Sequence, residues 1–289
     1  MKWNKEITGY FSLIKFSHTI FAMPFALIGF FLATEYQGYP FSWVKLGLVL
    51  LCMVFARNAA MAFNRYADRM IDKKNPRTAS REIPKGLIKP AYALTFVIVN
   101  SLLFIATTWF INSLTFFLSP VALLVILGYS FTKKFTALCH FVLGIGLSLA
   151  PIGAYLAVSG KFDLLPLIYS LVVLFWASGF DVLYALQDED FDKSNKLKSL
   201  PVFLGQKGAM LISSAIHLLT AVFIVTAAIK GAFGILHWAG VGVFISLLAY
   251  QHIIVKKNGL KKINLAFFTT NGIASVVFSL FFITDLLLS

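Results

Sequence analysis

Acidic side chains are scarce in this 289-residue chain, and most of them lie in two short stretches. Of twelve acidic residues, the eight that cluster are Asp68, Asp72, Glu82, Asp181, Asp188, Glu189, Asp190 and Asp192. Residues spaced four apart in a helix share one face, so Asn64, Asp68 and Asp72 are predicted to form one row of oxygen ligands. Carboxylates stacked at this spacing repel one another unless a cation lies among them.

The second stretch repeats this arrangement 120 residues later. Its row consists of Asp181, Tyr184, Asp188 and Asp192, whose spacings also keep one helical face. Glu189 and Asp190 fall on other faces, and we expect both to be solvated. Helix-end charges facing water would explain one such row, but they leave the presence of two rows unexplained.

All-oxygen ligands without His or Cys favour Mg²⁺, which proteins commonly hold with a few carboxylates and substrate phosphates. Two facing rows with metal ions between them would therefore bind a diphosphate. The predicted metal ligands are Asn64, Asp68, Asp72, Asp188 and Asp192.

Basic residues follow both rows and are expected to complete the anion site. The predicted substrate-binding residues are Arg57, Arg77, Arg81, Lys133, Lys134 and Lys198. Arg57 differs from the rest because it lies within an apolar stretch, seven residues before Asn64 and about 10 Å deeper along the helix. A charge inside a membrane normally faces a cavity or a partner. We expect Arg57 to meet Asp181 across the cavity floor; the alternative is that Arg57 reaches the interface alone.

The rest of the chain must place these residues in a membrane. The chain as a whole is 59% hydrophobic and 13% charged, which is about half the charged fraction of a soluble domain. Windows of about 20 apolar residues predict nine spans: 16–34, 42–64, 91–111, 114–131, 136–158, 164–186, 208–229, 234–255 and 263–287. The expected fold is an all-α polytopic membrane protein, with nine transmembrane helices in one bundle around a central cavity that opens to the cytoplasm.

The chain is expected to form a single domain, 1–289, with a pseudo-repeat. The two halves are about 16–131 and 136–255, and a ninth helix follows at about 263–287. An amphipathic helix is expected at 3–14, and cleavage of the N-terminus as a signal peptide is not expected.

Lys and Arg fall mainly in alternate loops; the opposite side has only Lys45, Lys161 and Lys230. The positive-inside rule then places the N-terminus in the cytoplasm and the C-terminus outside. Topology and an anionic substrate therefore account for the net charge of +13, and no nucleic-acid partner is expected.

Both acidic stretches resemble known family motifs. Residues 64–86, NRYADRMIDKKNPRTASREIPKG, resemble the first aspartate-rich motif of the UbiA superfamily of membrane prenyltransferases, and residues 181–199, DVLYALQDEDFDKSNKLKS, resemble the second. The loop YSFTKKFT at 129–136 is similar to the loop after the family's fourth helix. The chain departs from the family pattern at Arg65, where many members have Asp.

This resemblance implies Mg²⁺-dependent transfer of a polyprenyl group from its diphosphate to an aromatic hydroxy acid in the bacterial inner membrane. The REIP segment and the run IKFSHTIFAMPFAL are similar to the bacterial quinone-pathway branch, including menaquinone enzymes of the futalosine route. The acceptor is thus either 4-hydroxybenzoate or 1,4-dihydroxy-6-naphthoate, for ubiquinone or menaquinone. Asp181 or Asp188 would act on the acceptor, Tyr184 would shield a carbocation, and Lys134 or Arg57 would hold the acceptor carboxylate.

Three alternatives belong to other classes. A secondary transporter would also use intramembrane charges, but it usually places them near the midplane on broken helices. The glycine-punctuated acidic pattern of CDP-alcohol transferases is missing from the sequence. A non-catalytic scaffold would leave both acidic rows without a role.

Overall fold

The computed structural model describes residue 13 and residues 19–289. The amphipathic helix expected at 3–14 and the start of the first expected span lie almost wholly outside the described residues. In the described part of the chain, every regular element is a helix. Within residues 19–289, eight helices are long and apolar enough to cross a membrane, and Phe21–Tyr36 is a shorter apolar helix.

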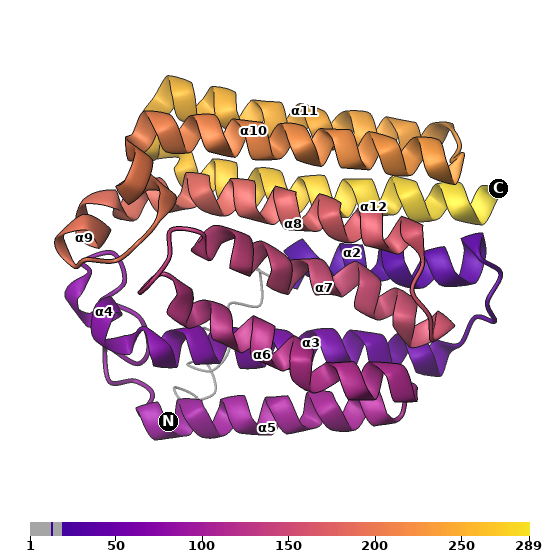
Figure 1. Cartoon of the computed structure of the whole chain (residues 1–289), viewed down its shortest axis with the longest axis horizontal. Helices are drawn as coiled ribbons and strands as arrows, with labels where there is room; N and C mark the ends of the chain where they lie inside the picture. Colours follow the sequence, from indigo (N-terminus) through magenta and orange to yellow (C-terminus); the bar gives the residue numbers. More distant parts are fainter. Residues whose placement is uncertain (1–12, 14–18) are drawn as a thin grey trace, which may run out of the picture.

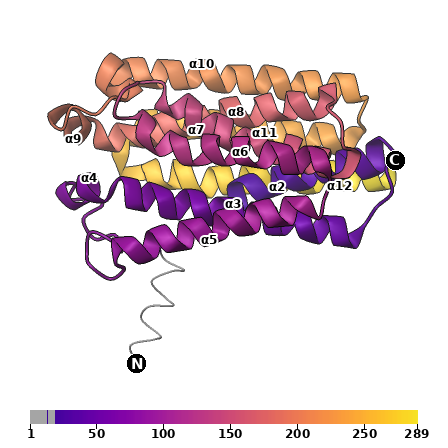
Figure 2. The ribbon, with the colours of Figure 1, turned by 60° about the horizontal axis from the view of Figure 1, so that its bottom comes forward.

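The helices pack side by side in one bundle (Figure 1). The long ones are α2 (Thr19–Phe31), α3 (Trp43–Ala67), α5 (Pro90–Trp109), α6 (Ser113–Thr132), α7 (Cys139–Ser159), α8 (Leu164–Ala185), α10 (Leu200–Gly231), α11 (Ile235–Asn258) and α12 (Thr270–Leu288). The prediction of an all-α, multi-pass membrane bundle is therefore confirmed. In Figure 1, α10, α11 and α12 lie along one side of it, and α3, α5 and α6 lie along the other; in the turned view of Figure 2, α10 and α5 lie at opposite edges.

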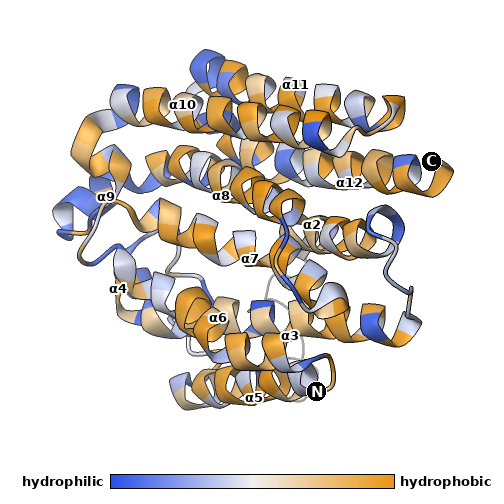
Figure 3. Ribbon diagram, turned by 45° about the vertical axis from the view of Figure 1, so that its right-hand side comes forward, coloured by the Kyte–Doolittle hydropathy of each residue, from blue (hydrophilic) through white to orange (hydrophobic). Residues whose placement is uncertain are grey.

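Two short helices, α4 (Arg69–Lys74) and α9 (Glu189–Ser194), lie together at one end of the bundle (Figure 1). Hydrophobic residues dominate the long helices, whereas α9 and its surroundings are hydrophilic (Figure 3). The two acidic stretches therefore lie at the same end, next to the apolar part of the bundle.

Aromatic packing fixes the helices that carry the second row. Trp176 of α8 is fully buried, and its ring centroid lies 5.3 Å from that of Phe25 in α2. Helices α2 and α7 also cross closely. A Cβ on Gly29 would lie 2.0 Å from the carbonyl oxygen of Pro151, so only glycine permits this crossing. Overpacking at such a contact is destabilising.

A buried polar network orients the start of α12. Trp176 Nε1 and Gln251 Nε2 each donate to Asn271 Oδ1 at 2.8 Å. Asn271 follows a π-helical segment, Leu265–Thr269, and such segments often occur at functional sites. This segment presents Phe267, whose ring stacks on Tyr184 with centroids 4.1 Å apart.

Candidate active site

The first acidic row crosses a break between two helices. Helix α3 ends at Ala67, Asp68 has φ −93° and ψ 0°, and α4 begins at Arg69, so the expected unbroken helix is wrong here. Backbone bonds across the break keep the helical spacing, since Asp68 N donates to Asn64 O at 3.0 Å and Asp72 N donates to Asp68 O at 2.8 Å. Asn64, Asp68 and Asp72 therefore still line one cavity.

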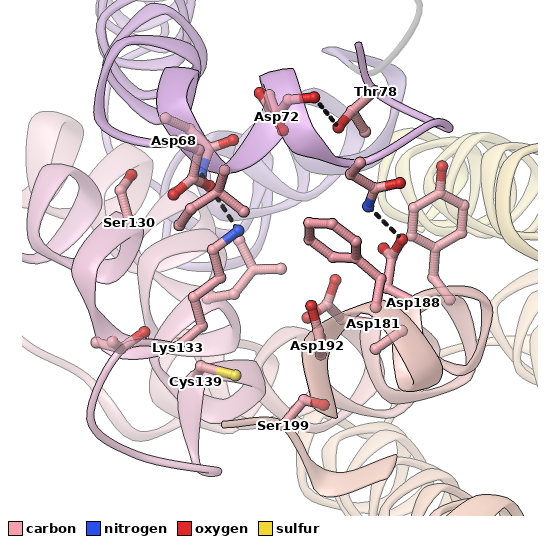
Figure 4. A pocket seen from close by; sticks show the side chains of 18 of the residues that line it. Asp68, Asp72, Thr78, Ser130, Lys133, Cys139, Asp181, Asp188, Asp192 and Ser199 are labelled. Carbon is pink, nitrogen blue, oxygen red and sulfur yellow. Dashed lines mark hydrogen bonds and ion pairs between the residues drawn. The ribbon is translucent and has the colours of Figure 1, made fainter. Parts of the chain in front are cut away.

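The second row also changes helix type along its length. Helix α8 ends at Ala185, a 3₁₀ turn covers Leu186–Asp188, and α9 carries Asp192. The members of this row, Asp181, Tyr184, Asp188 and Asp192, all line the same cavity as the first row, whose volume is about 220 Å³. Figure 4 shows Asp68 and Asp72 on one side of it and Asp188 and Asp192 on the other.

Glu189 and Asp190 lie outside the lining of this cavity. Asp190 is exposed, as expected. Glu189 is half-buried and its Oε2 atom is enclosed, so the expectation of solvation is wrong for Glu189.

Direct contacts join the two motifs across the cavity. Asn75 Nδ2 donates to Asp188 Oδ1 at 3.0 Å, a contact drawn in Figure 4. Arg77 Nε donates to the same oxygen at 2.9 Å, Arg77 Nη2 forms an ion pair with Asp188 Oδ2, and Arg77 Nη1 donates to Tyr184 OH at 3.1 Å. The loop after the first row therefore reaches the second row, and the two rows face each other.

Cations neutralise the first row. Lys133 Nζ lies 2.8 Å from Asp68 Oδ2, and Arg81 Nη1 lies 2.7 Å from Asp72 Oδ1. Both carboxylates are almost fully buried, at 2% and 3% exposure. Burial raises the pKa of the Asp68 carboxyl group, and the Lys133 ammonium group opposes that change.

Two predicted substrate-binding residues do not reach the cavity. Lys134 and Lys198 are exposed and belong to the lining of neither cavity described here. Lys134 Nζ lies 5.0 Å from the centre of the Phe131 ring, and Lys198 uses its backbone nitrogen to donate to Lys133 O at 2.7 Å. Neither side chain therefore lines the polar cavity as expected, although Lys134 still lies near enough to act on the charge of Asp68.

Asp181 has a partner that sequence reasoning missed. Its Oδ2 atom lies 2.7 Å from His140 Nδ1, whereas the expected pair with Arg57 is not among the ion pairs of the described residues. His140 begins an otherwise apolar α7, and that isolated polar position was the available signal. Asn75 was missed as well, although it lies within the first motif.

A second, larger cavity of about 500 Å³ opens from the first. It is lined mainly by apolar side chains from α3, α5, α6 and α7. The residues that line both cavities are Asn64, Arg81, Tyr129, Leu143, Asp181 and Tyr184, and we call this set the throat. Arg57 and Arg65 also line the larger cavity, and the Nε atom of each is buried without a hydrogen-bond partner.

The donor atoms around the polar cavity fit a hard cation. Asp68 Oδ1 is buried without a hydrogen-bond partner, and the nearby ligand atoms are carboxylate and amide oxygens. Among the described residues, no three His, Cys, Asp or Glu side chains are grouped closely enough to hold a metal. Mg²⁺ typically takes only one or two carboxylates and completes its shell with phosphate and water, so this donor set suits Mg²⁺ when a phosphate is present.

The fold and the two cavities define a multi-pass membrane protein whose site suits an amphiphile with an anionic head and an apolar tail. The UbiA prenyltransferase family model matches residues 22–273. The 4-hydroxybenzoate octaprenyltransferase of Aliivibrio fischeri (strain MJ11) is 31% identical over 251 residues, covering 86% of this chain and 85% of that protein. The chain belongs to the UbiA prenyltransferase family, and it is a prenyltransferase.

Solved structures of the same fold agree with this assignment. A UbiA homolog from Aeropyrum pernix K1 superposes with a TM-score of 0.85 at 30% identity, covering 93% of this chain and 98% of that one. A UbiA homolog from Archaeoglobus fulgidus, described as bound to GPP and Mg²⁺, has a TM-score of 0.77 at 21% identity, covering 96% and 99%. The comparisons give no support to the secondary-transporter alternative.

Proposed function

We propose that this enzyme transfers a polyprenyl group from its diphosphate to an aromatic hydroxy acid, either 4-hydroxybenzoate or 1,4-dihydroxy-6-naphthoate, in quinone biosynthesis. One observation carries this proposal: a polar cavity between two acidic rows opens directly into a large apolar cavity. The relative from Aliivibrio fischeri is named for 4-hydroxybenzoate, which makes that acid the first acceptor to test.

The polar cavity is proposed to hold the diphosphate. Asn64, Asp68, Asp72, Asp188 and Asp192 would hold Mg²⁺, which supplies positive charge to the leaving diphosphate when it is bound. Arg77, Arg81 and Lys133 line the same cavity and are paired there with acids. They would contact phosphate oxygens and stabilise the charge that develops on the leaving group.

The throat is proposed to hold the reacting carbon. As the allylic C–O bond breaks, its electron pair leaves with the diphosphate, and the allylic cation must be kept from water. Tyr184 lines the throat, and the stacked Phe267 lines the larger cavity beside it. The electron-rich faces of such rings stabilise a cation.

Arg57 and Asp181 are proposed to serve the acceptor. Arg57 lines the apolar cavity with its Nε atom unpaired, so an acceptor carboxylate would find a guanidinium group there. Asp181 lies at the throat and is oriented by His140, where its carboxylate can polarise the phenol as a ring carbon forms the new C–C bond. The displaced ring proton then leaves to a base, for which Asp181 and Asp188 are both proposed.

The orientation follows from the loop charges. We propose that the N-terminus lies in the cytoplasm and the C-terminus outside a bacterial inner membrane. The polar cavity would then open to the cytoplasm.

A direct assay tests the proposed function. Protein in nanodiscs is incubated with geranyl diphosphate and each acceptor, with Mg²⁺ or with excess EDTA, and the products are identified by mass spectrometry. We expect a geranylated acid with Mg²⁺, a fall of at least 100-fold with EDTA, and recovery after Mg²⁺ is restored. Failure of both acceptors to gain a prenyl group, or equal turnover in EDTA, would contradict the proposal.

A further inference from the structure

The wall that α7 contributes to the apolar cavity has an unusual composition. Besides larger side chains such as Leu147 and Ile152, it includes a row of small residues on one helical face: Gly146, Ala150, Gly153 and Ala157 follow at spacings of four, three and four. A Cβ placed on Gly153 would meet no atom within 4 Å, so this position faces open space inside the cavity. A Cβ on Gly146 would touch only Ile126 of α6, at 3.6 Å or more.

A buried arginine independently indicates that this cavity holds a ligand. Arg65 is 3% exposed, lines the cavity, and leaves its Nε atom without a hydrogen-bond partner. Glu82 and Asp72 lie near enough to act on this charge, but the Nε–H group has no acceptor among the described residues. An unpaired buried N–H is costly, so an anionic group entering through the throat is expected beside it. The ligand is therefore an amphiphile whose charged part lies near the throat and whose apolar part extends along α7.

We propose that the small side chains of α7 set how long an isoprenoid tail the enzyme accepts, with Gly146 and Gly153 as the two length-determining positions. The proposal rests on the proposed function above. Leu143 of α7 belongs to the throat, and a helix rises about 1.5 Å per residue, so Gly146 lies about 4.5 Å and Gly153 about 15 Å further along the cavity. By ordinary covalent geometry the four bonds of an isoprene unit span about 5 Å.

These distances predict where each substitution truncates the tail. A tail of two units reaches about 10 Å from the throat and stops short of Gly153, whereas a tail of four units passes it. Gly153→Leu should therefore exclude geranylgeranyl and spare geranyl and dimethylallyl donors. Gly146 lies at about the reach of the first unit, so Gly146→Leu should exclude geranyl as well and weaken dimethylallyl transfer less. Val121 and Phe162 of the lining are each 56% exposed, so part of the lining also reaches the outer surface of the bundle.

The test measures kcat/KM with dimethylallyl, geranyl and geranylgeranyl diphosphates, using the same acceptor, for wild type, Gly153→Leu and Gly146→Leu. The matched control is Gly242→Leu on α11, because Gly242 also has no atom within 4 Å of an added Cβ but is exposed and outside the cavity lining. Thermal unfolding in detergent accompanies each assay.

We expect Gly153→Leu to lower the geranylgeranyl-to-geranyl ratio of kcat/KM at least 10-fold, and Gly146→Leu to lower the geranyl-to-dimethylallyl ratio by a similar factor. Gly242→Leu should leave both ratios within twofold of wild type. Ratios that stay at wild-type values, or that fall equally for all donors or equally in the control, overturn the proposal. If the wild-type enzyme itself transfers none of the three donors, it is the proposed function that fails.

Discussion

Replacing Asp188 with asparagine is expected to lower kcat for prenyl transfer by about 10²- to 10³-fold, the loss typical when one group that stabilises transition-state charge is removed. Asp188 stands between the two motifs, where Asn75 and Arg77 both donate to it. Asparagine keeps an oxygen acceptor for these donors, so the fold should persist while the charge that attracts the metal is lost. Steady-state kinetics with geranyl diphosphate and Mg²⁺ measure the effect.

Asp190 offers the matched control for this substitution. It lies two residues further along the chain, in the first turn of α9, but it is exposed and does not line the cavity. Asp190→Asn should leave kcat within twofold of the wild type. If Asp188→Asn and Asp190→Asn are equally active, the second row does not belong to the diphosphate site.

Arg57→Met is expected to raise the KM of the aromatic acid about 100-fold with little change in KM for the prenyl diphosphate. Removing one partner of a buried charged contact costs about 2–5 kcal/mol, and about 2.7 kcal/mol is a factor of 100 in affinity. Because Arg57 Nε has no hydrogen-bond partner among the described residues, its replacement by an apolar side chain should leave the thermal unfolding temperature unchanged or raise it.

Two comparisons make the Arg57 result specific. Arg57→Lys keeps the positive charge but loses the planar guanidinium group, which can donate two parallel hydrogen bonds to a carboxylate. The KM of this variant for the acceptor should therefore fall between those of the wild type and Arg57→Met. Lys256→Gln, at an exposed position near the end of α11, should change neither KM. An Arg57→Met enzyme with a wild-type acceptor KM would place the carboxylate elsewhere.

Helical spacing predicted which acids come together. The rows that end in Asp72 and Asp192 were found from spacings of three and four residues, and both rows line one cavity. The breaks at Asp68 and at Leu186–Asp188 were not predicted, because periodicity reports a shared face and not where a helix changes type. The first row survives its break because backbone hydrogen bonds continue across it.

Partners between distant helices were harder to predict. Asp181 was expected to meet Arg57, but His140 of α7 lies closer and takes its carboxylate. Lys134 and Lys198 were expected in the site because of their sequence neighbours, yet both are exposed and line neither cavity. Contacts of this kind depend on how helices rotate against each other and on the conformation of the loops. A single sequence contains little information about either.

The apolar cavity had almost no signature in the sequence. Its walls come from six helices, α2, α3, α5, α6, α7 and α8, and its width comes from small residues such as Gly153. In an apolar bundle, small residues also serve close helix packing, as Gly29 does against Pro151. Only the packed structure separates these two uses of glycine.

The central claim is that the two acidic rows hold metal ions and a diphosphate between them. The most direct measurement is a structure of the enzyme with Mn²⁺ in place of Mg²⁺ and an unreactive geranyl diphosphate analogue, with the metal identified by anomalous scattering. We expect Mn²⁺ peaks contacted by Asp68 or Asp72 on one side and by Asp188 or Asp192 on the other, with the diphosphate between them and the geranyl chain beyond Tyr184. A diphosphate bound outside this cavity, or Mn²⁺ peaks that touch neither row, would contradict it.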